Sequence, residues 1–215
     1  MGLTSIPTFS GEEKVRLLSL QHNLIAKLEG TMSLPRLVFL DLYDNQVEKI
    51  AGLQELPNIK VLLLGKNRYF NFIFCLIIYH WILFGIKRVR RIEGLDALTR
   101  LEVLDLHGNQ LTSLAGLSPL ADLKVLNAAG NQLRMVTENE LRGLSALEEL
   151  NLRRNRIRRV EGIGHAPKLV KLFLSNNNIT TYVQFKSFSL IPTSLCFDKL
   201  SLAWKNWVAW EKQAN

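Results

Sequence analysis

The chain has 215 residues, of which 47% are hydrophobic, and this length and composition fit one or two globular domains with a sizeable core. The formal net charge of +8 favours an acidic partner, whether nucleic acid, an anionic membrane surface or acidic protein tails. Two cysteines, Cys75 and Cys196, exclude a disulfide-rich secreted framework, so we expect a reducing compartment, the cytoplasm. The opening residues MGLTSIPTFSGEE contain no apolar run, and no signal peptide is expected there.

A short polar lead-in, residues 1–14, precedes a repeated pattern. Its clearest copy is Leu101–Leu111, LEVLDLHGNQL, which reads L-x-x-L-x-L-x-x-N-x-L. The copies begin at Val15, Leu37, Ile59, Leu101, Leu123, Leu147 and Leu169, and their asparagines are Asn23, Asn45, Asn67, Asn109, Asn131, Asn155 and Asn177. The steps between starts are 22, 22, 42, 22, 24 and 22 residues. This period and consensus predict a leucine-rich repeat solenoid.

Each repeat predicts a strand, a turn and a return segment. Leu104 and Leu106 alternate with outward positions, which is typical of a short strand with one buried face. Asn109 then turns the chain, and its amide can bond the backbone of neighbouring coils. Apolar residues in the second half recur every three positions, as in Ile92-x-x-Leu95-x-x-Leu98, the spacing of a 3₁₀ turn. The expected fold is an α/β repeat over residues 15–182, with about seven 22-residue coils, parallel strands on the concave face and 3₁₀ turns on the convex face.

One segment interrupts this pattern. Tyr69–Ile86 is nearly all apolar, and Lys87 and Arg88 follow it. Removing residues 69–88 shortens the interval from Asn67 to Leu101 from 34 to 14 residues, which is the interval in the two preceding repeats. A stretch of this length reaches that of a membrane span, but a span would cut the shared core in two. The alternatives are a non-native insertion such as a retained intron, a native hydrophobic insertion, and a membrane segment at 69–86.

The pattern frays after Tyr182. Residues 183–215 are predicted to form a degenerate cap, in which Trp204, Trp207 and Trp210 recur every three residues and close the open end of the core. A membrane-surface stripe is the alternative interpretation of the tryptophans.

The sequence does not favour catalysis. The four histidines are scattered, and no Cys/His pair has metal-ligand spacing. There is neither a phosphate-binding glycine loop nor a nucleophile elbow. We therefore expect a non-enzyme with no cofactor, no metal and no small-molecule substrate.

Function is expected on the concave face, where alternate strand side chains point away from the core. Leu17, Phe39, Val61, Val103 and Val125 form an apolar row there, beside a mixed polar row. Exposed aromatic residues next to Asp and Arg are typical of protein–protein surfaces, although β-propensity alone also favours Val and Phe in strands. The predicted partner-binding residues are Phe39, Asp41, Tyr43, Asp44, Val61, Leu63, Lys66, Val103, Asp105, His107, Glu149, Arg153, Lys171 and Phe173.

A basic run, RRNRIRR, supplies a second predicted site. Its members Arg153, Arg154, Arg156, Arg158 and Arg159 all occupy variable positions of the repeat. Arginine pairs bidentately with carboxylates, so the run is a candidate site for an acidic partner; a merely solvated surface is the alternative. Nucleic acid is disfavoured as the partner because no aromatic residues are interleaved with the arginines.

Five segments resemble a known family: LSLQHN (18–23), FLDLYDNQ (39–46), VLLLGKNR (61–68), VLDLHGNQ (103–110) and LNLRRN (150–155). They are similar to the leucine-rich repeat-containing protein 49 family, non-catalytic subunits of the tubulin polyglutamylase complex. The 22-residue period also resembles the cytosolic repeats typified by a regulatory subunit of protein phosphatase 1. The first resemblance implies a scaffold that binds tubulin or a glutamylase complex at the cytoskeleton, centrosome or cilium.

Two alternatives to this microtubule-linked scaffold stay open. A regulator that binds protein phosphatase 1 would use acidic and aromatic residues of the concave face, such as Asp41, Tyr43, Asp105 and Phe173. A membrane-anchored recognition protein requires that residues 69–86 span a membrane.

Overall fold

The computed structural model describes residues 2–9, 11, 14–28, 34–54, 56–67 and 91–179. The predicted insertion 69–88, with its membrane candidate 69–86, lies outside these residues, as does the predicted cap 183–215. The repeat domain predicted over 15–182 is described as far as residue 179. Within the described ranges, no helix is both long enough and apolar enough to cross a membrane.

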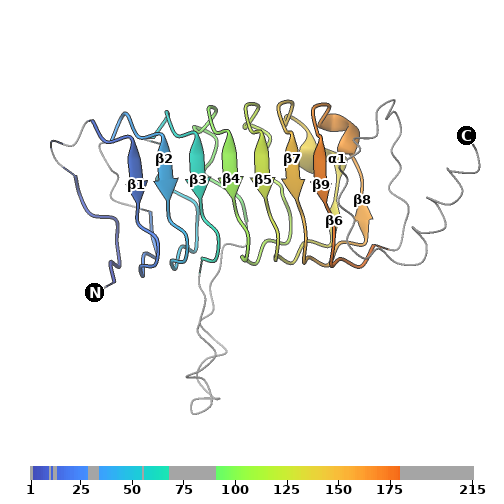
Figure 1. Cartoon of the computed structure of the whole chain (residues 1–215), viewed down its shortest axis with the longest axis horizontal. Helices are drawn as coiled ribbons and strands as arrows, with labels where there is room; N and C mark the ends of the chain where they lie inside the picture. Colours follow the sequence, from blue (N-terminus) through green and yellow to red (C-terminus); the bar gives the residue numbers. More distant parts are fainter. Residues whose placement is uncertain are drawn as a thin grey trace, which may run out of the picture.

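Seven three-residue strands form one parallel sheet that runs the length of the solenoid (Figure 1). They are β1 (Leu17–Ser19), β2 (Phe39–Asp41), β3 (Val61–Leu63), β4 (Val103–Asp105), β5 (Val125–Asn127), β7 (Glu149–Asn151) and β9 (Lys171–Phe173). Each pairs with the next in register, so that equivalent residues of successive repeats lie side by side. The predicted leucine-rich repeat solenoid is confirmed. We call the outward side of this sheet the strand face.

The register continues across residues 69–88. Val61 in β3 pairs with Val103 in β4, just as Val103 pairs with Val125 in the next coil. Residues 91–100 pack on the second coil, where Arg100 Nη1 donates to Asn58 Oδ1 at 2.8 Å. An alanine Cβ at Gly94 would lie 2.3 Å from the Ile50 carbonyl oxygen, so this turn packs directly on the preceding coil.

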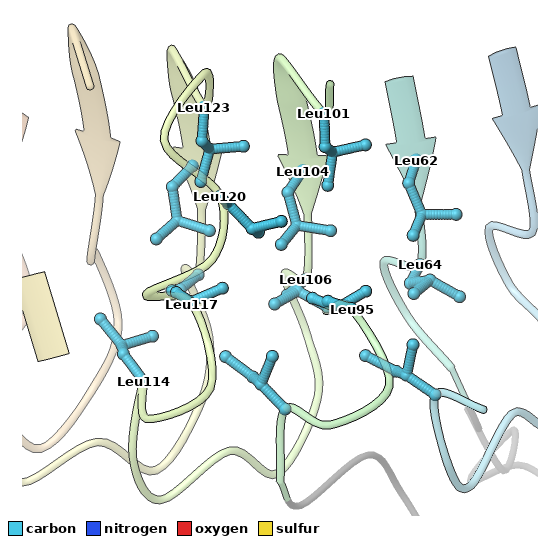
Figure 2. Close-up of a cluster of buried hydrophobic side chains, with 14 of the residues drawn as sticks. Leu62, Leu64, Leu95, Leu101, Leu104, Leu106, Leu114, Leu117, Leu120 and Leu123 are labelled. Carbon is cyan, nitrogen blue, oxygen red and sulfur yellow. The ribbon is translucent and has the colours of Figure 1, made fainter. Parts of the chain in front are cut away.

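The core is made of leucines from both sides of each coil. Leu104 and Leu106 point inward from the strand side and meet Leu117 and Leu120 from the return segment (Figure 2). Every one of these side chains is fully buried. Burying a leucine contributes about 1.5–3 kcal/mol, and each coil gains this only because its neighbours cover it.

Asparagine side chains hold the turns together, as predicted. Asn131 Nδ2 donates to the carbonyls of Leu106 and Ala128 at 3.0 Å, while its Oδ1 accepts from the Leu111 backbone N–H at 2.9 Å. The asparagine therefore bridges two coils and supplies partners to buried backbone groups that no strand satisfies. The equivalent asparagines at 45, 67, 155 and 177 make the same set of bonds.

The predicted 3₁₀ turns are present on the convex side. Backbone i→i−3 hydrogen bonds recur there, for example from Leu98 to Leu95 and from Leu101 to Leu98. Among the described residues, however, they extend to a 3₁₀ helix only in η3 (Ile163–His165). The longer fifth repeat instead forms the one-turn helix α1 (Glu138–Leu141), where Thr137 and Glu140 make a reciprocal capping box. A second sheet pairs β6 (Met135–Val136) with β8 (Arg159–Val160).

An ion-pair row follows the starts of β3, β4 and β5. The Glu102 carboxylate accepts from Lys124 Nζ at 2.8 Å and Lys60 Nζ at 2.6 Å. The bond from Lys124 has the larger effect, and together the two bonds lower the pKa of Glu102 from 4.5 to about 2. Because the pKa is lower in the folded chain, the bonds stabilise it above pH 4.5, and this stabilisation is lost as the pH falls toward 2.

We therefore expect Glu102→Gln to lower the melting temperature at pH 6 and to have little effect near pH 2. The three side chains are partly exposed, so 1 M NaCl should also reduce the difference at pH 6. Thermal melts of the unaltered chain and of Glu102→Gln between pH 6 and pH 2 measure this difference in melting temperature. A difference that is independent of pH would show that the glutamate acts through packing rather than charge.

Candidate functional site

The strand face collects the fourteen predicted partner-binding residues. They come from the first and third residues of the strands and from the turns that follow, and the structure places them in two groups. The first group covers coils two to four, and the second covers coils six and seven.

The apolar row is continuous. Phe39, Val61, Val103 and Val125 are register partners on adjacent strands, and all four are half-buried. Leu17 extends the row at its N-terminal end and is 63% exposed. The row is therefore an uninterrupted apolar strip on the surface of five coils, larger than the isolated apolar residues that surfaces normally carry.

Tyr43 is the centre of an aromatic cluster beside this row, which we call the Tyr43 cluster (His22, Tyr43, Lys66 and His107). The Tyr43 ring lies 5.8 Å from the His22 ring in an edge-on arrangement and 5.5 Å from the His107 ring. Lys66 Nζ lies 5.4 Å from the Tyr43 centroid, within the range of a cation–π contact. The cluster brings residues of four successive coils together.

Gly65 makes the contact between Tyr43 and His107 possible. A Cβ at Gly65 would lie 2.5 Å from His107 Nδ1 and 3.2 Å from Tyr43 Cδ2, so any side chain here would separate the two rings. The sequence prediction included Tyr43, Lys66 and His107 but not His22 or Gly65. The sequence did contain a signal for this contact: Gly65 occupies the repeat position at which the second and fourth coils have Tyr43 and His107.

Two predicted carboxylates hold the fold as well as facing outward. Asp41 Oδ1 accepts the backbone N–H of Tyr43 at 2.9 Å, and its Oδ2 accepts from the Ser19 hydroxyl at 3.3 Å. Asp105 accepts the His107 N–H at 2.9 Å, and the two side chains also approach to 2.9 Å. These bonds close Asx turns, so the aspartates orient Tyr43 and His107. Asp41 is only 8% exposed and presents little surface to a partner.

The second group lies at the C-terminal coils. Glu149 and Lys171 are register partners and form an ion pair of 3.1 Å. The Arg153 guanidinium carbon lies 4.4 Å from the Phe173 ring centroid, a close stacking contact. Phe173 is therefore partly covered by arginine and lies three strands beyond Asp105 in the sheet. Of the four residues expected to serve a phosphatase regulator, the structure brings Asp41, Tyr43 and Asp105 together and places Phe173 apart from them.

The five arginines of the basic run do not share one surface. Arg153 belongs to the strand face, and Arg154 follows it in a left-handed conformation with φ 54°. Beyond the buried Asn155 the chain leaves the sheet, since the backbone N–H of Arg156 bonds the Leu133 carbonyl. Arg158 continues that segment, bonding Arg134, and Arg159 lies in β8, where it pairs with Glu161 at 3.3 Å.

No group of three or more His, Cys, Asp or Glu side chains arranged to hold a metal ion occurs in the part of the chain that the structure describes. The described strand-face residues form a surface suited to binding a protein.

Comparisons with known proteins agree with this fold. The Leucine Rich Repeat family profile matches residues 100–120. Human leucine-rich repeat-containing protein 49 is 46% identical over 43 residues, which are 20% of this chain and 6% of that protein. The chain thus matches only a small part of this relative's length.

Solved structures extend the likeness to the whole solenoid. An internalin C2 of Listeria monocytogenes superposes with a TM-score of 0.69 at 22% identity, over 91% of this chain and 76% of its own. A second internalin of that organism gives 0.64 at 24% identity, over 87% and 49%. A leucine-rich repeat protein of Leptospira interrogans gives 0.60 at 23% identity, over 79% and 39%. At these identities the likeness establishes the fold alone.

Proposed function

We propose that this leucine-rich repeat solenoid is a non-catalytic protein-binding scaffold, and specifically an adaptor subunit of a microtubule-associated complex of the tubulin polyglutamylase type. The observation that carries the binding role is the apolar row beside the Tyr43 cluster. Both are held rigid by the sheet and by Asx turns, so little conformational entropy is lost when a partner binds. An aromatic residue beside an apolar strip is the composition that concentrates binding energy at protein interfaces.

The microtubule assignment depends on the segments that resemble leucine-rich repeat-containing protein 49, to which a 43-residue stretch is 46% identical. The net charge of +8 agrees with an acidic partner such as tubulin. The expected location is the cytoplasm, at the cytoskeleton, centrosome or cilium. Regulation of protein phosphatase 1 is the alternative, and it would rely on the neighbouring Asp41, Tyr43 and Asp105 without Phe173.

Affinity purification of the tagged chain from a microtubule-rich cell extract, followed by mass spectrometry, tests the proposal. Val103→Lys places a charge in the centre of the apolar row and is expected to reduce partner recovery at least about tenfold, since it disrupts the anchor region of the interface. Met135→Lys is the matched control: it adds the same charge at a 44% exposed residue of β6, outside the seven-stranded sheet, and should recover the partner normally.

The identity of the recovered proteins separates the alternatives. Tubulin together with a glutamylating ligase supports the adaptor, and a phosphatase catalytic subunit supports the alternative. Recovery of neither would contradict both partner assignments. Equal recovery with Val103→Lys and Met135→Lys would contradict binding through the strand face.

A further inference from the structure

We propose that Arg153, stacked on Phe173, receives a carboxylate side chain from an acidic segment of the partner protein. This inference rests on the proposed protein-binding function and specifies the chemistry of the partner at the C-terminal coils. It also narrows the basic run to the two arginines, Arg153 and Arg154, that stand at the strand face.

The contacts of Arg153 hold its guanidinium in one orientation. Its backbone N–H is fixed by Asn151 Oδ1 at 3.2 Å, and its guanidinium lies over the Phe173 ring at 4.4 Å. The Nε atom is shielded from solvent and has no hydrogen-bond partner in the described coils, so a partner's carboxylate would be bound by the two terminal Nη groups. Packing on the ring, rather than an internal carboxylate, therefore sets the orientation of the side chain. A guanidinium held in this way loses little freedom on binding and can donate two parallel bonds to a carboxylate.

The neighbouring ionic groups leave this position positive. Lys171 lies one strand away and is paired with Glu149, which neutralises both. On the other strand-face coils, His22 contacts Asp44 at 2.8 Å and His107 contacts Asp105 at 2.9 Å. Arg153 differs from these groups, because its guanidinium packs on an aromatic ring.

The surroundings of Arg153 are also open toward the preceding coil. Ala129 and Gly130 occupy the places in coil five that Arg153 and Arg154 occupy in coil six, so no long side chain extends from those two places. The backbone contact between these places is direct, since the Gly130 N–H bonds the Arg153 carbonyl at 2.8 Å. An extended segment of a partner can thus lie against the small residues while an acidic side chain reaches Arg153 and the exposed Arg154.

Protein carboxylates fit this position better than nucleic acid does. Bases bind single-stranded sites by stacking on exposed aromatic faces, and the Phe173 face is already covered by the guanidinium. A carboxylate needs only the outer edge of the guanidinium, which the stacking leaves available.

Fluorescence anisotropy with the full chain and a labelled decaglutamate peptide tests the assignment. Arg153→Gln should weaken binding about tenfold, because a charge-assisted bidentate pair is lost. Arg153→Lys keeps the charge but not the planar fork and should give an intermediate loss. Arg156→Gln is the matched control: it removes the same charge on the segment that has left the sheet, and should change the affinity less than about twofold, as expected for a distant exposed charge. Thermal melts confirm that all variants remain folded.

Each outcome bears on the assignment. Equal losses for Arg153→Gln and Arg156→Gln would show that the peptide responds to net charge alone and would overturn it, as would no binding by the unmodified chain. Tighter binding of a labelled oligouridylate than of decaglutamate, with the same Arg153 dependence, would assign the position to nucleic acid instead. If decaglutamate binding is unaffected by Arg153→Gln while Val103→Lys still reduces partner recovery, the scaffold function stands and this inference fails.

Discussion

Joining Arg68 directly to Val89, by deleting residues 69–88, is expected to raise the melting temperature by about 2–12 °C. Asn109 Oδ1 is buried and has no hydrogen-bond donor among the described residues. In the other coils this oxygen accepts the backbone N–H of the residue two places after the preceding asparagine, as Val47 donates to Asn67 and Leu111 to Asn131. The deletion places Val89 at that position. Satisfying a buried acceptor is worth about 1–3 kcal/mol, and each 1 kcal/mol shifts the melting temperature of a chain of this size by about 2–4 °C.

A double-mutant cycle isolates the cause. Asn109→Ala removes the acceptor, so the deletion should stabilise the Asn109→Ala chain less than it stabilises the unaltered one. Differential scanning calorimetry of the unaltered chain, the deletion, Asn109→Ala and their combination gives the coupling free energy between the deletion and Asn109. A lower melting temperature after the deletion would mean that residues 69–88 contribute to the solenoid and are not an interruption of it. Equal stabilisation in both backgrounds would point to the shorter connection rather than to Asn109.

The strands, the core and the asparagine turns could be predicted because each depends on local spacing. Leu104 and Leu106 are separated by one residue, so both must face one side of a strand, and a repeat of this pattern specifies what covers them. The same logic located the insertion, since removing 20 residues restores the spacing between Asn67 and Leu101. The in-register pairing of β3 with β4 agrees with this spacing.

The details of the strand face depend on side-chain direction, which spacing does not specify. Asp41 and Asp105 read as free acidic groups in the sequence, yet both turn back to cap the backbone two residues later. The contact of Tyr43 with His107 spans two coils and depends on the missing side chain of Gly65, a property of three repeats together.

The basic run illustrates the opposite difficulty. Its arginines are adjacent in sequence, but the turn at Asn155 separates Arg153 from Arg158 and Arg159, which belong to the segment leading into the second sheet. In a solenoid, residues one coil apart are closer neighbours than residues five apart in the chain. A charge run therefore predicts a charged surface only where it remains within one side of the coil.

The largest loss of stability is expected from Asn131→Ala, in the centre of the solenoid. The change leaves the Leu111 N–H without its acceptor and takes one donor each from the buried carbonyls of Leu106 and Ala128. One buried N–H without an acceptor and two carbonyls with one donor fewer lower the free energy of unfolding by about 3 kcal/mol. This corresponds to a fall of about 6–12 °C in melting temperature. Because each coil is stabilised only by its neighbours, a weak coil here divides the array into two short halves.

Hydrogen exchange should therefore show the loss of protection concentrated in the strands on either side of Asn131, β4, β5 and β7, rather than spread evenly. Asn178→Ala is the matched control, since Asn178 is exposed and its substitution should change stability by no more than about 0.5 kcal/mol. If the two variants melt within about 2 °C of each other, the asparagine bonds contribute little beyond the leucine core, and the coils are joined by apolar packing alone. If Asn131→Ala also weakens partner recovery while the residues of the apolar row are unchanged, the rigidity of the strand face is itself part of its binding function.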